Sequence, residues 1–189
     1  PELCCALDDD FRGHDRLRSL LRSAPSYGND DPAADRLGRE VMAAFTETVS
    51  RHAAIHETEV KFPCGVATFS WYIGIGEGLG PTPDGRHAGE PVSSNFSPAL
   101  GRDRNGLPAA ILSYSSMGHE RLPAGGPIDL RLQRKLVEGS EGTVRMAGLV
   151  RALVELGGSM MTLTVVDTDE LRAAQKDPDS YESLRVRMG

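Results

Sequence analysis

The sequence of 189 residues has little of several features that usually identify a functional class. It contains three cysteines, two of them adjacent at Cys4 and Cys5, which excludes a disulfide framework and a paired zinc site. Its 21 basic residues are outnumbered by 27 acidic ones and form no basic stripe, so nucleic acid is not an expected partner. No stretch reaches the roughly 20 apolar residues that span a bilayer, and the first residues have no signal-peptide pattern. These absences predict a cytoplasmic protein with reduced thiols and no membrane contact.

Aromatic residues are also scarce. They make up 5% of the sequence, and Trp71 is its single tryptophan, so we expect a core of Leu, Val, Ala and Met side chains. The apolar fraction of 39% is nevertheless too high for a disordered chain. The length suits one domain with its own core.

The first third of the sequence has helical periodicity. Apolar residues recur at helical spacing through residues 1–21 with a break near Gly13, which predicts two short helices. Asp31 and the proline after it form a helix-start signal, so we expect a helix over about 32–52. We therefore expect residues 1–58 to be helical. The apolar face of the longer helix would contain Leu37, Val41, Ala44, Phe45 and Val49.

The pattern then changes to mixed α/β. β-Branched and aromatic residues dominate 60–75, which predicts a buried strand, and a loop rich in turn-forming residues follows as far as Pro108. Further along we expect strands at 109–113 and 160–166, helices at 143–156 and 170–176, and an extended run at 184–188. Helices and strands that alternate with short links are typical of a parallel α/β layer.

Three residues of the first predicted strand are candidates for substrate binding. Ser70, Trp71 and Tyr72 would line a pocket if this strand faces a cavity. Ser70 and Tyr72 would share one face of the strand, where their hydroxyls either contact a ligand or fill a half-buried surface.

Other motifs do not identify a reaction. The run from Gly74 to Gly80 fails the dinucleotide spacing, because Leu79 stands where a third glycine belongs, so a phosphate-binding protein or free-standing hydrolase is a weak alternative. His52 and His56 precede Glu57 in an order that reverses the zinc-protease motif, and we predict no metal site. We expect small, buried thiols at Cys4, Cys5 and Cys64.

Several separated motifs resemble the glycyl radical enzymes of the pyruvate formate-lyase type. In order along the chain they are residues 24–31 (APSYGNDD), 81–91 (PTPDGRHAGEP), 97–106 (SPALGRDRNG), 156–158 (LGG), 163–167 (LTVVD) and 174–178 (AQKDP). Each motif has a physical interpretation; for example, Pro83-Asp84-Gly85 sets a turn, and Arg86 offers a fork of hydrogen-bond donors to the carboxylates of neighbouring loops.

The resemblance implies part of a ten-stranded α/β barrel that is incomplete in this chain. Residues 1–189 would be a single carboxy-terminal segment, with 59–189 supplying barrel strands, a long loop and the start of the glycyl radical domain. The intact parent would be a homodimeric lyase, dehydratase, decarboxylase or formate acetyltransferase acting on a small organic substrate. A separate activase that uses S-adenosylmethionine and an iron–sulfur cluster would install the radical, and no cofactor would stay bound.

The sequence departs from the family pattern in two places. None of its cysteines lies in the Gly-Cys-x-Glu context that the family uses for the catalytic thiol. The last residues, 184–189, are similar to a family run Val-Arg-Val-Ala-Gly-Tyr. This similarity places Gly189 one position before the radical glycine of the family. A shift of the alignment by one residue would make Gly189 the radical glycine itself. We therefore expect the isolated chain to be inactive and to self-associate.

A non-catalytic role is the alternative. The chain would then be a spare-part or assembly module that docks on an incomplete partner barrel. Such a module must carry the whole radical loop, and this sequence stops at Gly189, which makes the alternative weaker.

Overall fold

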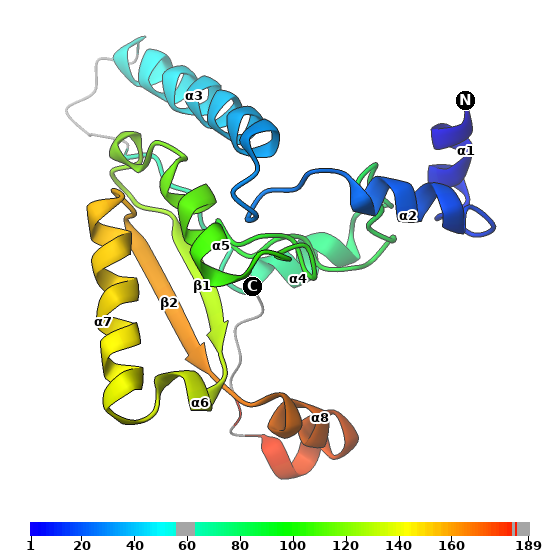
Figure 1. Ribbon diagram of the computed structural model, residues 1–189. Helices are drawn as coiled ribbons and strands as arrows, with labels where there is room; N and C mark the ends of the chain where they lie inside the picture. Colours follow the sequence, from blue (N-terminus) through cyan, green and yellow to red (C-terminus); the bar gives the residue numbers. More distant parts are fainter. Residues whose placement is uncertain (56–62, 183, 185–189) are drawn as a thin grey trace.

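The computed structural model describes residues 1–55, 63–182 and 184. Figure 1 shows a two-stranded sheet flanked by helices, an arm that projects from it, and a long helix above the sheet. The arm consists of α1 (Glu2–Asp8) and α2 (Asp15–Ser23), and the long helix is α3 (Pro32–Ile55). The remaining helices are α4 (Trp71–Glu77), α5 (Gly106–Ser115), α6 (Arg134–Val137), α7 (Gly139–Glu155) and α8 (Thr168–Lys176), with short 3-10 turns η1 (His119–Arg121) and η2 (Pro178–Tyr181).

The sheet consists of β1 (Pro127–Leu132) and β2 (Met160–Val165), which run parallel. Their register pairs Pro127 with Met160 and Leu132 with Val165. The connection passes through α6 and α7, and α7 lies along the sheet in Figure 1. This unit confirms the predicted parallel α/β arrangement, because parallel neighbours need such a crossover.

The core lies where α5 packs on β1. The buried apolar side chains from α5, β1, α7 and the intervening turns form one cluster: Phe96, Ala110, Ile111, Tyr114, Met117, Leu122, Ile128, Leu130 and Leu153. Each Å² of apolar surface that this cluster removes from water stabilises the fold by about 25 cal/mol.

The start of α3 follows its sequence signal. A side-chain oxygen of Asp31 accepts the backbone N–H groups of Ala33 at 2.9 Å and Ala34 at 3.2 Å, and Pro32 occupies the first turn, where its missing N–H costs nothing. The predicted helix over 32–52 is confirmed and extends to Ile55. The two short helices before it are confirmed as α1 and α2.

The predicted strand at 60–75 is wrong over its described residues. Trp71–Glu77 forms α4, and a turn precedes it in which Phe69 has a φ of +48°. The close approach of another segment explains part of this local fold, because a Cβ at Gly76 would lie 2.3 Å from the backbone oxygen of Glu90. The apolar and β-branched composition alone did not distinguish this short helix from a strand.

The prediction at 109–113 is also wrong, because these residues belong to α5. The short apolar run is buried on one side of a helix, and such runs fit either structure. β1 was not predicted, although Ile128, Leu130 and Leu132 alternate with polar or charged residues as in a strand. The predictions at 143–156, 160–166 and 170–176 are confirmed as α7, β2 and α8. The extended run expected at 184–188 lies outside the described residues apart from Leu184.

Several apolar faces are exposed. On α3, Leu37 and Val41 are each 60% exposed, although they were expected to form a packed face. On α7, Val150 and Val154 are exposed too, whereas Leu153 is buried. Nothing in the described chain covers these stripes, and large exposed apolar patches mark surfaces that contact other protein.

The thiols differ from their expected burial. Cys4 and Cys5 are exposed, since α1 packs mainly through Ala6, and the prediction of buried thiols is wrong for both. Cys64 is partly buried against the core, and its Sγ donates to the backbone oxygen of Arg121 at 3.2 Å. None of the helices in the described part of the chain is long and apolar enough to cross a membrane.

Candidate functional site

The long loop, residues 80–102, is anchored to β1, to the turn before α4 and to the arm by side-chain hydrogen bonds. Its attachment to the sheet is Asp129 of β1, which is 3% exposed. Asp129 Oδ2 accepts hydrogen bonds from Ser94 Oγ at 2.7 Å and Asn95 Nδ2 at 2.6 Å, and Ser97 Oγ accepts the backbone N–H of Asp129 at 2.9 Å. Charge-assisted bonds in a buried place are strong, so this carboxylate fixes the second half of the long loop on β1.

Asn95 connects that anchor to the start of α4. Its Oδ1 accepts the backbone N–H groups of Thr68 at 2.8 Å and Phe69 at 3.2 Å, and Thr68 Oγ1 accepts the N–H of Asn95 at 2.8 Å. Asn95 has a φ of +52°, which asparagine tolerates better than most residues. One side chain therefore holds the long loop, β1 and the turn before α4 together.

Arg86 organises the first half of the long loop. Its guanidinium is buried and donates to the backbone oxygens of His87 at 3.0 Å and Glu90 at 2.6 Å, and also to that of Gly80. The expectation that Arg86 ties carboxylates of neighbouring loops is wrong for the described residues, because its hydrogen-bond acceptors are carbonyl oxygens of its own loop.

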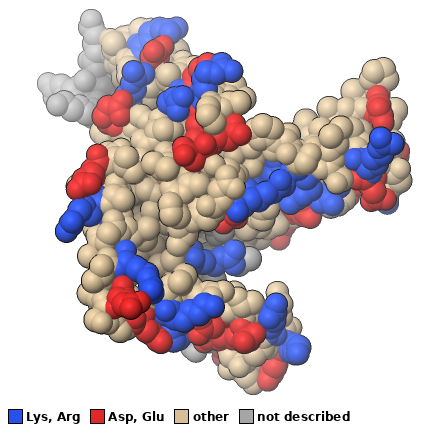
Figure 2. Space-filling model, in the orientation of Figure 1, with Lys and Arg blue, Asp and Glu red and all other residues tan. Residues whose placement is uncertain are grey.

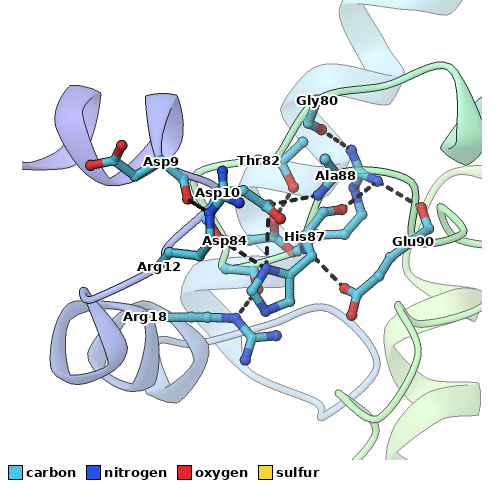
Figure 3. A network of polar contacts seen from close by, with 12 residues as sticks. Asp9, Asp10, Arg12, Arg18, Gly80, Thr82, Asp84, His87, Ala88 and Glu90 are labelled. Carbon is cyan, nitrogen blue, oxygen red and sulfur yellow. Dashed lines mark hydrogen bonds and ion pairs between the residues drawn. The ribbon is translucent and has the colours of Figure 1, made fainter.

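The arm packs on the same loop. Asp10 Oδ1 accepts the backbone N–H of Ala88 at 2.8 Å and lies 3.3 Å from His87 Nδ1 (Figure 3). The hydrogen bond from Ala88, and then the His87 side chain, lower the pKa of Asp10 against partial desolvation. From α2, Arg18 Nε donates to the backbone oxygen of Gly85 at 2.8 Å. The arm thus holds the turn at Gly85 from the outside.

The motif at 24–31 binds the other end of the long loop. Asn29 Nδ2 donates to the backbone oxygen of Arg102 at 2.7 Å, and Asn29 Oδ1 accepts the N–H groups of Arg104 at 2.7 Å and Asn105 at 3.1 Å. The segments recognised separately in the sequence therefore contact one another in space.

The three predicted substrate-binding residues do not share a surface. Ser70 and Trp71 are exposed, Trp71 to 72%, whereas Tyr72 is 7% exposed and its backbone oxygen accepts the N–H of Val92 at 3.2 Å. Their separation follows from the helical turn, in which consecutive side chains point about 100° apart. The shared strand face predicted for Ser70 and Tyr72 is wrong.

The other predicted site residue, Gly189, lies outside the described residues. The chain reaches it through β2, α8 and η2. Among the described residues, no three His, Cys, Asp or Glu side chains lie together in a way that could hold a metal ion. His119 is buried against Tyr114, and its Nε2 lies 2.7 Å from the backbone oxygen of that residue, a contact within the core.

Comparisons with known protein families decide the classification. Residues 1–76 match the family model described as pyruvate formate lyase-like, and residues 92–189 match the one described as glycine radical. The second match alone covers more than half of the chain. The chain belongs to the glycyl radical enzyme family. The motif resemblance seen in the sequence is thereby confirmed.

Individual glycyl radical enzymes are similar over nearly the whole chain. Isethionate sulfite-lyase of Desulfovibrio desulfuricans is 34% identical over 99% of this chain and 23% of its own length. Trans-4-hydroxy-L-proline dehydratase of Clostridioides difficile is 35% identical over 97% of this chain and 23% of its own length. The chain therefore spans about a quarter of the length of the curated relatives that it matches.

A solved glycyl radical enzyme has the same fold. The glycerol-bound B12-independent glycerol dehydratase from Clostridium butyricum superposes with a TM-score of 0.87 and 31% identity, over 98% of this chain and 23% of the other. The chain is thus a partial α/β segment of a glycyl radical enzyme barrel, as the resemblance implied.

Sequence reasoning missed the residues that organise this segment. Asp129, Ser94 and Asn95 were not singled out, although the alternation of apolar and charged residues in 127–132 is a strand signal that would have placed Asp129 on a strand. The pairing of Asn29 with 102–105 had no signal in the sequence beyond the motifs themselves.

Proposed function

We propose that this chain is a segment of a larger enzyme that cleaves a C–C, C–O, C–N or C–S bond of a small organic substrate by thiyl and glycyl radical chemistry. The observation that carries the proposal is the match of residues 92–189 to the glycine radical family model. Relatives named as a sulfite-lyase and a dehydratase support radical cleavage as the reaction class. The segment itself supplies barrel wall and the approach to the radical loop.

Gly189 is proposed as the residue before the radical glycine or, in the alternative register, as the radical glycine. A glycine is required at the radical position because it lacks a side chain, so an α-carbon radical can be stabilised by the amide groups on both sides. The catalytic cysteine would come from the rest of the parent enzyme, since Cys64 donates to a backbone oxygen and Cys4 and Cys5 lie on the outer arm.

Ser70 and Trp71 remain proposed contacts to substrate in the parent enzyme. Both are exposed at the start of α4, where Asn95 fixes the preceding turn. Tyr72 is proposed to hold the long loop instead of substrate, because its side chain is buried and its backbone binds Val92.

The partners follow from the same chemistry. A radical S-adenosylmethionine activase would install the radical and would carry the iron–sulfur cluster, so this chain needs no metal site of its own. The rest of the barrel would cover the exposed apolar faces of α3 and α7, and the intact enzyme would be a homodimer. The activase chemistry and the three free cysteines suit a reducing cytoplasm.

The test is activity of the parent protein under anaerobic conditions. We expect turnover of a small alcohol, amine or sulfonate only after treatment with the activase, S-adenosylmethionine and a reductant, and loss of turnover on exposure to air. Turnover that is independent of the activase and insensitive to air would overturn the proposal. Restored activity on adding the separate 189-residue chain to a barrel that lacks this segment would instead support the spare-part module.

A further inference from the structure

A cavity of about 570 Å³ lies between α2 and the long loop. Four arginines line it, Arg18 and Arg22 from α2 and Arg86 and Arg102 from the loop, and they outnumber its two carboxylates, Asp84 and Glu90. Figure 2 shows basic side chains gathered along the lower side of the arm. The volume is typical of a pocket for a small molecule.

The cavity carboxylates balance the four arginines only in part: desolvation and Arg22 lower the pKa of Arg102, and the charge of Asp84 raises it by less. None of the four forms an ion pair with a carboxylate in the described chain, although other arginines of the chain do. The two carboxylates of the cavity have other roles: Asp84 Oδ1 accepts from Thr82 Oγ1, and Glu90 Oε2 accepts the N–H of His87 at 2.9 Å. Asp84 thus attracts Arg102 without touching it, and neither carboxylate forms a salt bridge with any of the four guanidinium groups in the described residues.

Two of the arginines are buried. Arg86 is 8% exposed, and its Nε has no hydrogen-bond partner in the described residues although Nη1 and Nη2 are bound to carbonyl oxygens. Arg102 is 4% exposed; desolvation, and next the nearby Arg22, lower its pKa. Buried cations with unused donors are costly unless a counter-charge accompanies them.

Arg22 is the most available of the four. Its side chain lines the cavity and makes no hydrogen bond or ion pair with the described residues, whereas Arg18 and Arg102 donate to the backbone oxygens of Gly85 and Asp84. The guanidinium of Arg22 thus presents a planar fork of donors, which matches the geometry of a carboxylate, phosphate or sulfonate group.

We propose that this cavity is an oxyanion-binding site in which Arg22 and Arg86 contact the anion and Arg18 and Arg102 hold the cavity walls. The ligand chemistry is one oxyanion, carboxylate, phosphate or sulfonate, beside the apolar wall formed by Pro91, Val92 and Leu100. The anion comes either from a free small molecule or from an acidic side chain of the rest of the parent enzyme. The site is independent of the radical chemistry proposed above.

The test is calorimetric titration of the purified chain with inorganic sulfate at constant ionic strength. Arg22→Gln removes one charge and no internal bond, and should weaken sulfate binding about tenfold or more while leaving the far-UV circular dichroism unchanged. Arg16→Gln is the matched control, since Arg16 lies on the same helix but is exposed and outside the cavity, and it should leave binding unchanged.

The outcomes decide both the site and its source. Absence of sulfate binding, or equal binding by wild type, Arg22→Gln and Arg16→Gln, overturns the proposal. Binding by the chain and by the parent enzyme points to a free anion, whereas binding by the chain and not by the parent points to an acidic side chain of the parent. In either case the glycyl radical signal of the parent tests the proposed function separately.

Discussion

The phenolic oxygen of Tyr114 accepts the backbone N–H of Met160 at 3.0 Å, which ties α5 to the first residue of β2. The same oxygen lies 2.7 Å from the backbone oxygen of Gly126, just before β1, and accepts the N–H of Ser159 at 3.2 Å. Tyr114 is fully buried, so a single side chain joins the starts of both strands from inside the core. The sheet depends on this junction because each of its strands has one neighbour in the described chain.

Replacing Tyr114 by Phe should destabilise the chain by about 1–3 kcal/mol, because it leaves buried backbone groups of both strands without their partner. Urea unfolding followed by circular dichroism measures the change in the free energy of unfolding. Tyr181→Phe is the control, since the hydroxyl of Tyr181, in η2, makes no hydrogen bond within the described residues, and its effect should be near zero. Equal effects of the two substitutions would contradict the role of the junction.

Asn95→Gly should loosen the attachment of the long loop. Glycine tolerates the positive φ of this position, so the substitution removes the bonds to Asp129, Thr68 and Phe69 without adding backbone strain. We expect a loss of about 2–3 kcal/mol and faster hydrogen exchange of the Thr68 and Phe69 amides.

The control for this experiment is Asn105→Ala, which removes a surface hydrogen bond to the backbone oxygen of Asn29. It should leave exchange at Thr68 and Phe69 unchanged. Unchanged exchange in Asn95→Gly itself would show that the loop is held by other contacts.

His119 should make stability depend on pH. Burial lowers the pKa of His119 below its ordinary value of 6.5, so the native state holds it neutral while the unfolded chain takes up a proton as pH falls. The free energy of unfolding should therefore decrease as pH is lowered from about 6.5, with no contribution from His119 above that pH. Urea unfolding between pH 5 and pH 8 measures the slope.

His119→Gln should remove the pH dependence of the free energy of unfolding that His119 causes, because glutamine does not titrate. His52→Gln, at an exposed position of α3, is the surface control. The interpretation is contradicted if the free energy of unfolding of His119→Gln decreases below pH 6.5 as steeply as that of the wild-type chain.

The exposed apolar face of α3 should make the isolated chain self-associate. Leu37 and Val41 are a turn apart on this face, and Leu37→Glu combined with Val41→Lys replaces them with a favourable i, i+4 pair. Light scattering across a concentration series should give a larger monomer fraction for the double variant, and no change for Thr48→Glu on the same helix. A strictly monomeric wild-type chain would contradict the expectation.

Local signals in the sequence were enough to predict the helical first third, the α7–β2–α8 succession and the parallel layer, because capping residues and periodic apolar faces act within a few residues. Long-range contacts explain the errors. Gly76 packs against the backbone of Glu90, and Asn95 fixes the turn at Thr68 and Phe69, so residues 71–75 form helix where their own composition favours a strand. The apolar face of α3 was expected to be packed, because an apolar stripe does not reveal whether the same chain or another one covers it.

Gly189 allows the radical position to be assigned. Gly189→Ala in the parent enzyme should preserve the radical signal if Gly189 precedes the radical glycine, because alanine is compatible with that neighbouring position in the family run. Loss of the signal in a folded variant would identify Gly189 as the radical residue. Circular dichroism and the yield of activase-bound enzyme provide the fold control.

The central claim is tested most directly by electron paramagnetic resonance of the parent enzyme after anaerobic activation. The enzyme is produced with natural glycine and, separately, with glycine carrying ¹³C at its α-carbon. We predict an organic radical signal that broadens with the label and disappears in air. Failure of the fully activated enzyme to give a signal, or a signal that the label leaves unchanged, would contradict the account.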